Sequence, residues 1–539
     1  MPRVLALPLL LACGWAQAQL PPIPTPGAVQ DSVMQPRLPQ LSSPPEVMFS
    51  REPAVQQRAQ TQRFLVSGFT FKGNTQFSEA LLRQLVEPYL DLQLTLGELD
   101  RIADRITAFY RSRGFTVARA YLPAQRVEDG LVTIQIIEGS VESVVFRSEG
   151  RYGRAFLDPY VTPLLMGDGS NLVTDARLER QLLLMNDLPG LRARATLAPG
   201  QKFGTSMVEI ETQDKPVGVS LGANNYGSET TGEHRWDAGI ELNNPLRLGD
   251  QLSLRVIRST EQLFAWNRLG YTIPLGHDGL RLGLSRTATD YDLGGVFAPL
   301  EISGKVRSAD ATLSYPFVRS RAKNVIGALQ WRQTTSQQRV LGIPFSESKL
   351  PLLVGSVYTN WVASDSSANS VSVAASTNAL KSGNDSVTGD FGRFLKLDAE
   401  WTYLTGAGRN LDFFFRGKYV MATREVPDAE KMPLGGESSV RGYAPSILRG
   451  DSGYQMTFEL RRQFLLASKP GYAAAFADLG GVKNKGPFLG YDRASSLGVG
   501  YTQYLGNYGQ FKVELAKPMI RVFDRKQSER IWLSVNLAF

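Results

Sequence analysis

Residues 395–403 read LKLDAEWTY and alternate strictly between apolar and polar side chains. The polar positions are mostly charged and of both signs, whereas the apolar positions include Trp401 and Tyr403. A period of two predicts a β-strand with two different faces. An aromatic-rich face opposite a face of mixed charge fits a strand that has lipid outside and a hydrated lumen inside.

The same pattern recurs along the second part of the chain. Residues 411–419 and 454–461 alternate in the same way, and helical periodicity disappears after Pro216. The chain ends IWLSVNLAF (531–539), and a final strand with a terminal Phe resembles the outer-membrane barrel signature. At about 10 residues per strand and a similar share per connection, residues 217–539 predict a transmembrane antiparallel β-barrel of about 16 strands.

The composition agrees with a barrel and argues against most enzymes. The 59 Lys and Arg exceed the 51 Asp and Glu by 8, and the mean hydropathy is −0.17, as expected for strands whose two faces cancel. Two His and one Cys offer almost no material for a zinc site or a Cys/His nucleophile. A G-x-S-x-G match at 218–222 lies in an alternating stretch and lacks the strand–turn–helix context of a hydrolase. We therefore expect no enzymatic activity, no metal and no cofactor.

The first 63 residues predict export followed by a linker. Residues 1–18 combine Arg3, a short apolar run and an A-Q-A ending at Ala18, which is typical of a secretory signal peptide. Lipoprotein processing at Cys13 is an alternative. Residues 19–63 are rich in Pro and Gln and predict an extended segment. Within it, residues 28–35 form either a short plug helix or disordered chain.

Residues 64–216 predict two copies of one small α/β module. The order β-α-α-β-β occurs in 64–139, with Ser78 as the N-cap of its first helix, a second helix over 98–113 and strands over 116–122 and 131–137. The order recurs in 140–216, with helices over 155–165 and 175–186 and strands over 141–146, 191–197 and 207–211. Repetition at this spacing indicates a tandem scaffold.

Several motifs carry a resemblance to a known family. Residues 178–190 (LERQLLLMNDLPG), 243–254 (NNPLRLGDQLSL) and 271–285 (YTIPLGHDGLRLGLS) contribute to it, together with V-R-G-Y at 440–443 and F-x-D-x-G at 476–480. Together they resemble the two-partner-secretion transporters (TpsB type, the ShlB/FhaC/HecB family). This family belongs to a superfamily, including the BamA insertases, that joins POTRA modules to a β-barrel. The resemblance implies POTRA 1 at 64–139, POTRA 2 at 140–216 and a barrel at 217–539. It also implies the outer membrane of a Gram-negative bacterium, with the POTRA modules in the periplasm.

The family's signature places V-R-G-Y on a loop that folds back into the barrel and F-x-D-x-G on a following strand. The resemblance thus implies a loop latch, formed by Val440, Arg441, Gly442, Tyr443, Phe476, Asp478 and Gly480. A guanidinium fork matches a carboxylate, so Arg441 and Asp478 can form a bidentate contact. We expect Gly442 to permit a backbone turn and Gly480 a close approach of loop to strand. The alternative is that Arg441 and Asp478 are unrelated lumen charges.

The resemblance implies that the POTRA modules capture an unfolded exoprotein by its N-terminal two-partner-secretion domain and pass it outward without ATP. Strand addition would use the edges 117–122 and 191–197. The candidate residues on these edges are Val117, Arg119, Tyr121, Arg192 and Arg194. Arginines at an edge serve equally well as protection against aggregation. Further expected partners are outer-membrane lipid, the barrel-assembly machinery and periplasmic chaperones, and no nucleic acid. The alternative function is that of a BamA-type insertase.

Overall fold

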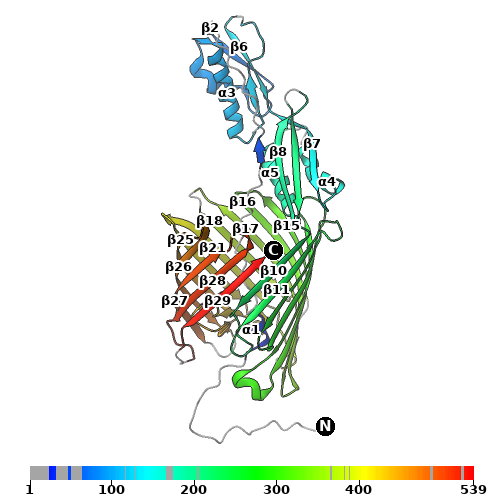
Figure 1. Ribbon diagram of the computed structural model, residues 1–539, viewed down its shortest axis with the longest axis vertical. Helices are drawn as coiled ribbons and strands as arrows, with labels where there is room; N and C mark the ends of the chain where they lie inside the picture. The colour runs from blue at the N-terminus through cyan, green and yellow to red at the C-terminus, as the bar shows by residue number, and fades with distance from the viewer. Residues whose placement is uncertain are drawn as a thin grey trace.

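The computed structural model describes residues 24–31, 47–49, 63–115, 117–127, 129–165, 174–202, 205–364, 367–380, 383–387, 389–485, 490–523 and 527–539. The expected signal peptide, Cys13 and most of 19–63 lie outside these residues. Two small α/β units project from one end of a large β-barrel (Figure 1). We call this the POTRA end of the barrel.

The barrel is a closed sheet of sixteen long antiparallel strands, which confirms the predicted architecture. Its seam is the pairing of the first strand with the last, from Ser220 opposite Ala538 to Asn224 opposite Ser534. Two two-residue strands, β19 (Asn384–Asp385) and β20 (Gly389–Asp390), join the same sheet. The sixteen strands are β10 (Val217–Asn224), β11 (Arg235–Asn243), β12 (Gln251–Ser259), β13 (Phe264–Pro274), β14 (Arg281–Asp292), β15 (Ser303–Arg319), β16 (Lys323–Val340), β17 (Ile343–Val362), β18 (Ala368–Thr377), β21 (Leu395–Gly408), β22 (Leu411–Ala422), β25 (Ser452–Leu466), β26 (Lys469–Lys483), β27 (Tyr491–Tyr504), β28 (Gly509–Pro518) and β29 (Arg530–Ala538).

The strands have the two faces that the alternation predicts. On β21, Leu395 and Trp401 are exposed on the outer surface, whereas Lys396 between them is buried and hydrogen-bonds to a loop inside the barrel. The outer surface is therefore apolar where lipid would lie, and the charges face inward. No described helix is both long and apolar enough to cross a bilayer.

The first α/β unit begins with β2 (Arg63–Val66), which pairs with β4 (Leu92–Thr95). The sheet that follows has the order β3 (Gly68–Lys72), β6 (Leu131–Ile137), β5 (Arg119–Tyr121). Helices α2 (Glu79–Val86) and α3 (Leu96–Ser112) pack on it; Ser78 caps α2 as predicted, and a Thr95–Glu98 capping box starts α3. Burial and neighbouring Glu138 raise the pKa of Tyr110, which keeps its hydroxyl protonated as a donor to that carboxylate.

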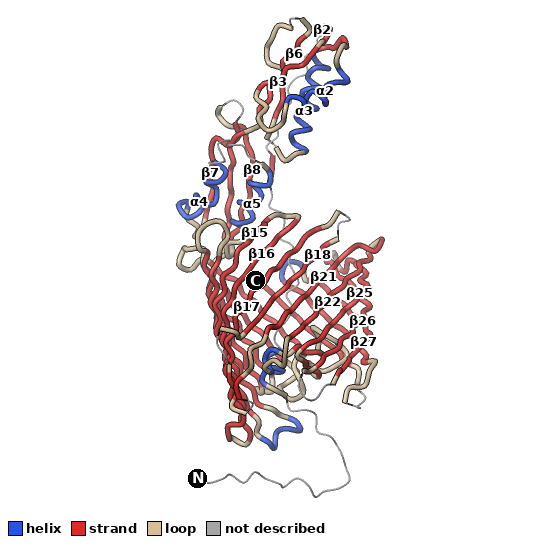
Figure 2. The backbone as a smooth tube through the Cα atoms, turned by 180° about the vertical axis from the view of Figure 1, so that it is seen from behind, coloured by secondary structure: helices blue, strands red, loops and turns tan. Residues whose placement is uncertain are grey.

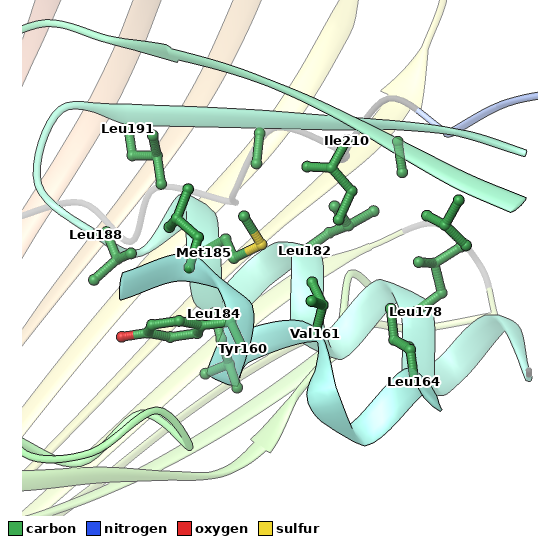
Figure 3. Close-up of a cluster of buried hydrophobic side chains, with 14 of the residues drawn as sticks. Tyr160, Val161, Leu164, Leu178, Leu182, Leu184, Met185, Leu188, Leu191 and Ile210 are labelled. Carbon is green, nitrogen blue, oxygen red and sulfur yellow. The ribbon is translucent and has the colours of Figure 1, made fainter. Parts of the chain in front are cut away.

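The second unit repeats this topology. Strand β9 (Thr205–Asp214) lies between β7 (Ser140–Glu149), to which it is parallel, and β8 (Leu191–Pro199), to which it is antiparallel. The same arrangement relates β6 to β3 and β5 in the first unit. Helices α4 (Arg154–Leu165) and α5 (Asp175–Asn186) cover one face, and their leucines fill the core (Figure 3).

Two strands of the α/β region differ from the sequence expectations. The strand expected over 116–122 spans only Arg119–Tyr121, because the chain turns after Gly114, where Ala118 donates its N–H to the carbonyl of Phe115. An unexpected strand, β1 (Val47–Phe49), pairs in parallel with Ala195–Leu197 of β8. Its sequence signal was three apolar residues within a polar linker.

Candidate functional site

The connection between β22 and β25 folds back into the barrel. Residues 423–451 contain a 3-10 turn, η3 (Asp428–Glu430), and a small hairpin of β23 (Met432–Leu434) and β24 (Leu448–Gly450). We call residues 423–451 the returning loop. The tip of its hairpin carries the V-R-G-Y motif. Seen from behind, loop segments lie inside the barrel at the end away from the α/β units (Figure 2).

Arg441 at the tip is held by Asp478 of β26. The guanidinium donates from Nε to Oδ2 at 2.9 Å and from Nη2 to Oδ1 at 2.7 Å, and the backbone N–H of Arg441 also donates to Oδ2. Both residues are buried, with 3% and 1% of their surfaces exposed. The Arg441 guanidinium carbon lies 3.3 Å from the ring centroid of Phe476. The residues of the two motifs therefore lie together at one contact.

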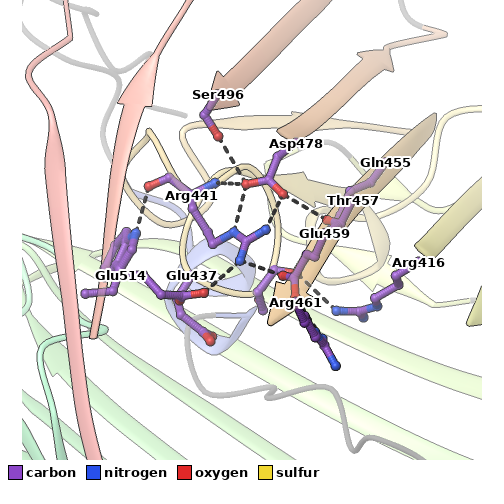
Figure 4. Close-up of polar contacts among 12 residues, drawn as sticks. Arg416, Glu437, Arg441, Gln455, Thr457, Glu459, Arg461, Asp478, Ser496 and Glu514 are labelled. Carbon is purple, nitrogen blue, oxygen red and sulfur yellow. Dashed lines mark hydrogen bonds and ion pairs between the residues drawn. The ribbon is translucent and has the colours of Figure 1, made fainter. Parts of the chain in front are cut away.

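Two further carboxylates share Arg441. Its Nη1 donates to Glu459 of β25 at 2.8 Å and to Glu514 of β28 at 2.7 Å (Figure 4). Arg461 and Lys512 pair with these two carboxylates from the other side. Among the described residues, Arg441 is the only cation paired with Asp478. Lys512 also pairs with Glu437, so the four carboxylates of this group already exceed its three cations, and loss of Arg441 would widen that excess.

Sequence reasoning did not assign Glu459 and Glu514 to the site. The signal was available for Glu459, because it alternates with outward-facing Phe458 and Leu460 and must face the lumen. Strand parity does not reveal which lumen charges meet a loop that arrives from elsewhere in the chain.

Val440 and Tyr443 anchor the tip through packing. Both side chains are completely buried, in a cluster with Leu434, Leu448 and residues of the barrel wall. The Tyr443 hydroxyl donates to the carbonyl of Ile520 at 2.7 Å and accepts from its N–H at 3.1 Å. The tip is thus held by apolar burial as well as by charge.

The two glycines of the motifs lie where the loop touches the wall. A Cβ atom on Gly442 would lie 2.8 Å from the Pro518 nitrogen and 2.8 Å from the Ser496 Cβ. Gly442 does not have a positive φ, so the expected special turn is wrong, and close approach is what requires a glycine here. At Gly480 a Cβ would lie 2.4 Å from a Leu434 methyl of the returning loop.

A second anchor holds the base of the returning loop to other strands. Glu430 of η3 accepts from Lys396 of β21 at 2.7 Å and from Arg332 of β16 at 2.5 Å. The side chains of Lys396 and Glu430 are buried, and that of Arg332 is 26% exposed. The returning loop therefore bridges the lumen from β16 and β21 to β25, β26 and β28.

A short helix from the N-terminal segment rests against the same loop base. Helix α1 (Pro26–Asp31) lies within the barrel, away from the POTRA end (Figure 1). Asp428 accepts from the N–H of Gly27 at 3.0 Å, and Arg449 donates to the Thr25 hydroxyl at 2.9 Å. The helix expected over 28–35 starts two residues earlier, and residues 32–35 lie outside the described part of the chain.

The candidate binding edges differ from each other. Arg119 and Tyr121 lie on β5, which pairs on one side with β6. Val117 is not on that strand: it packs against the core of the second unit, because the turn after Gly114 directs it there. On β8, Arg192 and Arg194 point outward, but Ala195–Leu197 are covered by β1. Only the start of the expected edge 191–197 is left uncovered by β1.

The lumen between these anchors contains a cavity of about 1610 Å³. Charged and polar residues of the wall line it on one side and residues of the returning loop on the other. In the described ranges no three His, Cys, Asp or Glu residues are grouped to hold a metal ion. The arrangement is that of a hydrated channel partly filled by its own loop and helix.

Comparison with known proteins gives two family matches. The family described as "Haemolysin secretion/activation protein ShlB/FhaC/HecB" matches residues 204–503, and the "POTRA domain, ShlB-type" matches residues 64–139. The heme/hemopexin transporter protein HuxB of Haemophilus influenzae is 24% identical over 479 residues, covering 85% of this chain and 84% of the relative. The hemolysin transporter protein ShlB of Serratia marcescens is 22% identical over 481 residues, covering 84% and 82%.

Solved structures share the fold. CdiB from Escherichia coli superposes with a TM-score of 0.68 at 19% identity, covering 90% of this chain and 93% of that chain. BamA from Haemophilus ducreyi lacking POTRA domains 1-3 superposes with a TM-score of 0.54 at 15% identity, covering 88% and 100%.

Proposed function

Because the chain belongs to the haemolysin secretion/activation family ShlB/FhaC/HecB, we propose that it is the outer-membrane pore of a two-partner secretion pair. The barrel lies in the outer membrane, with the POTRA units in the periplasm. Its cargo is an unfolded exoprotein, recognised by its N-terminal secretion domain at the POTRA units and passed through the lumen. The pore is not an enzyme. Outer-membrane lipid surrounds it, and assembly machinery and chaperones handle it during biogenesis.

This proposal is supported by the returning loop and helix α1, which lie inside the barrel and partly fill its lumen. The returning loop and α1 occupy the lumen, and they are held there by polar contacts to the wall and to each other and by two small apolar clusters, one around Val440 and Tyr443 and one around Val29. Polar contacts can be exchanged for water when the lumen opens, unlike a continuous apolar core. A pore that rests closed and opens for a chain has use for such contacts.

The placement of the α/β units supports entry of the cargo at this end of the lumen. The second unit lies above β15 and β16, the first unit lies beyond it and farther from the barrel, and the side of β25 to β27 is left uncovered (Figure 1). An insertase of the BamA type would instead release its substrate sideways through the seam between β10 and β29. That seam is closed here by backbone pairing along both strands.

Deletion of residues 64–139 is expected to lower cargo binding by about 10-fold, since strand addition to an exposed edge supplies backbone hydrogen bonds. The measurement is a pull-down by the exoprotein's N-terminal domain, which compares the purified wild-type chain with the purified deletion variant. An equal yield of heat-modifiable barrel in the outer membrane controls for assembly. Unchanged binding would move recognition to the second unit or the barrel.

A further inference from the structure

An ion pair joins the second α/β unit to the barrel, and it involves neither the V-R-G-Y nor the F-x-D-x-G motif. Asp187 follows α5, and its carboxylate accepts from Arg319 of β15, from Nε at 2.8 Å and from Nη2 at 2.7 Å. The Arg319 side chain is buried, with 7% exposed, and that of Asp187 is 30% exposed. Such a bidentate contact fixes orientation as well as distance.

The partners of this pair reach into the barrel wall. The third guanidinium nitrogen of Arg319 donates to Asn324 of β16, whose amide donates to Asn360 of β17, both at 2.8 Å. Arg281 of β14 donates to the backbone carbonyl of Asp187. The end of α5 is thus bound to four successive strands, β14 to β17.

Close packing surrounds the pair. Leu184 and Leu188 approach Gly279 and Gly249 in the barrel turns so closely that a Cβ there would lie 2.9 Å and 3.1 Å from their methyl groups. Both glycines also have positive φ, which glycine adopts readily. The ring of His277 packs edge-on against Tyr160 at 5.0 Å. Side chains of the second unit therefore fit between the turns.

A second ion pair lies nearby, and its arginine is more exposed than Arg319, although its carboxylate, Glu179, is only 15% exposed and also accepts the backbone N–H of Arg321. Glu179 accepts from Arg321 at 2.9 Å, and the Arg321 side chain is 57% exposed. A guanidinium exposed to solvent contributes little to stability, whereas a buried guanidinium held by both oxygens of a carboxylate constrains geometry. The two pairs provide a matched comparison at one interface.

Asp187 also borders the transport path, because it lines the lumen cavity together with Arg281 and Arg319. Domains of one chain move relative to each other unless their interface is large and hydrophobic. We propose that the Asp187–Arg319 pair is the positioning joint that sets the second POTRA unit over the entrance of the pore, so that cargo leaving β8 enters the lumen. This inference rests on the proposed export function.

The pair is tested by Asp187→Asn and Arg319→Lys, each of which removes the bidentate ion pair, with Glu179→Gln as the matched control. Spin labels at Gln201→Cys on the second unit and Arg409→Cys on the opposite barrel turn report the orientation, since Cys13 is the only native cysteine. We expect both test variants to broaden the distance distribution and to lower export about 10-fold, with cargo binding within twofold of wild type. Glu179→Gln should change none of these.

A distance distribution as narrow as that of wild type in Asp187→Asn would overturn the inference, as would normal export. If a variant and the wild type have equal amounts of heat-modifiable barrel in the membrane, a loss of export reflects a misplaced second unit and not a misfolded barrel. If the wild-type chain exports no exoprotein, the proposed function fails, while the distance measurement still decides whether the pair fixes orientation.

Discussion

Arg441→Ala is expected to leave the barrel inserted but to lower export by about 100-fold or more. The substitution removes the cation that pairs with Asp478 and leaves that carboxylate buried and unpaired. Removing one partner of a buried pair costs about 3–5 kcal/mol, and about 1.4 kcal/mol is a factor of ten in an equilibrium. The seated state of the returning loop should therefore cease to dominate.

Loss of seating lowers export because the export cycle requires the loop tip both to leave its seat and to return to it, and without Arg441 the tip does not return. Its apolar residues, which now pack with Val440 and Tyr443, would enter the cavity that the cargo needs. Arg307→Ala is the matched control, since Arg307 pairs with Asp290 while both side chains are more than a third exposed, and such pairs contribute about 0–1 kcal/mol. The measurement is the amount of exoprotein in the medium per inserted barrel. Wild-type export by Arg441→Ala would contradict the latch.

Gly442→Val is expected to reduce export to the level of Arg441→Ala with every charge retained. The new side chain would meet Pro518 and Ser496 at distances shorter than van der Waals contact, and backbone at the end of β28 cannot withdraw cheaply. The tip should therefore lift from the wall, and Arg441 with it. The measurement is again export per inserted barrel, combined with protease sensitivity of residues 435–447.

Gly355→Ala of β17 provides the control for adding a methyl group to a barrel glycine, because nothing lies within 4 Å of its Cβ position. It should export normally. If Gly442→Val also exports normally with a protected loop, close approach at the tip is not required for the seated state.

The barrel was predictable because its signal is local. A period of two over residues such as 395–403 determines both strand and facing, so the position of Lys396 inside the barrel follows from the sequence. The paired α/β units were predictable for the same reason, since 3.6-residue periodicity and caps such as Ser78 are local features. The strand expected over 116–122 is longer than the observed strand, because the turn that shortens it depends on where Phe115 and Ala118 are buried.

The site was predictable only in part. The V-R-G-Y and F-x-D-x-G motifs identified Arg441 and Asp478, but Glu459 and Glu514 have no motif and meet Arg441 only after the barrel closes. The Glu430–Lys396 contact and the Asp187–Arg319 pair join residues 34 and 132 positions apart. The sequence also did not reveal why a glycine is needed at position 442, because the atoms that exclude a side chain there belong to distant Pro518. These contacts depend on closure of the sheet, and no local pattern encodes them.

Passage of the cargo through the lumen can be tested by site-specific photo-crosslinking. A photoreactive residue replaces Lys418, which lines the cavity, Val357, which is exposed on the outer face of β17, or Leu221, which is exposed beside the seam. With a cargo stalled during export, passage through the lumen predicts a crosslink from position 418 and none from 357 or 221. Crosslinks from position 221 with none from 418 would contradict it and would indicate lateral release of an insertase type.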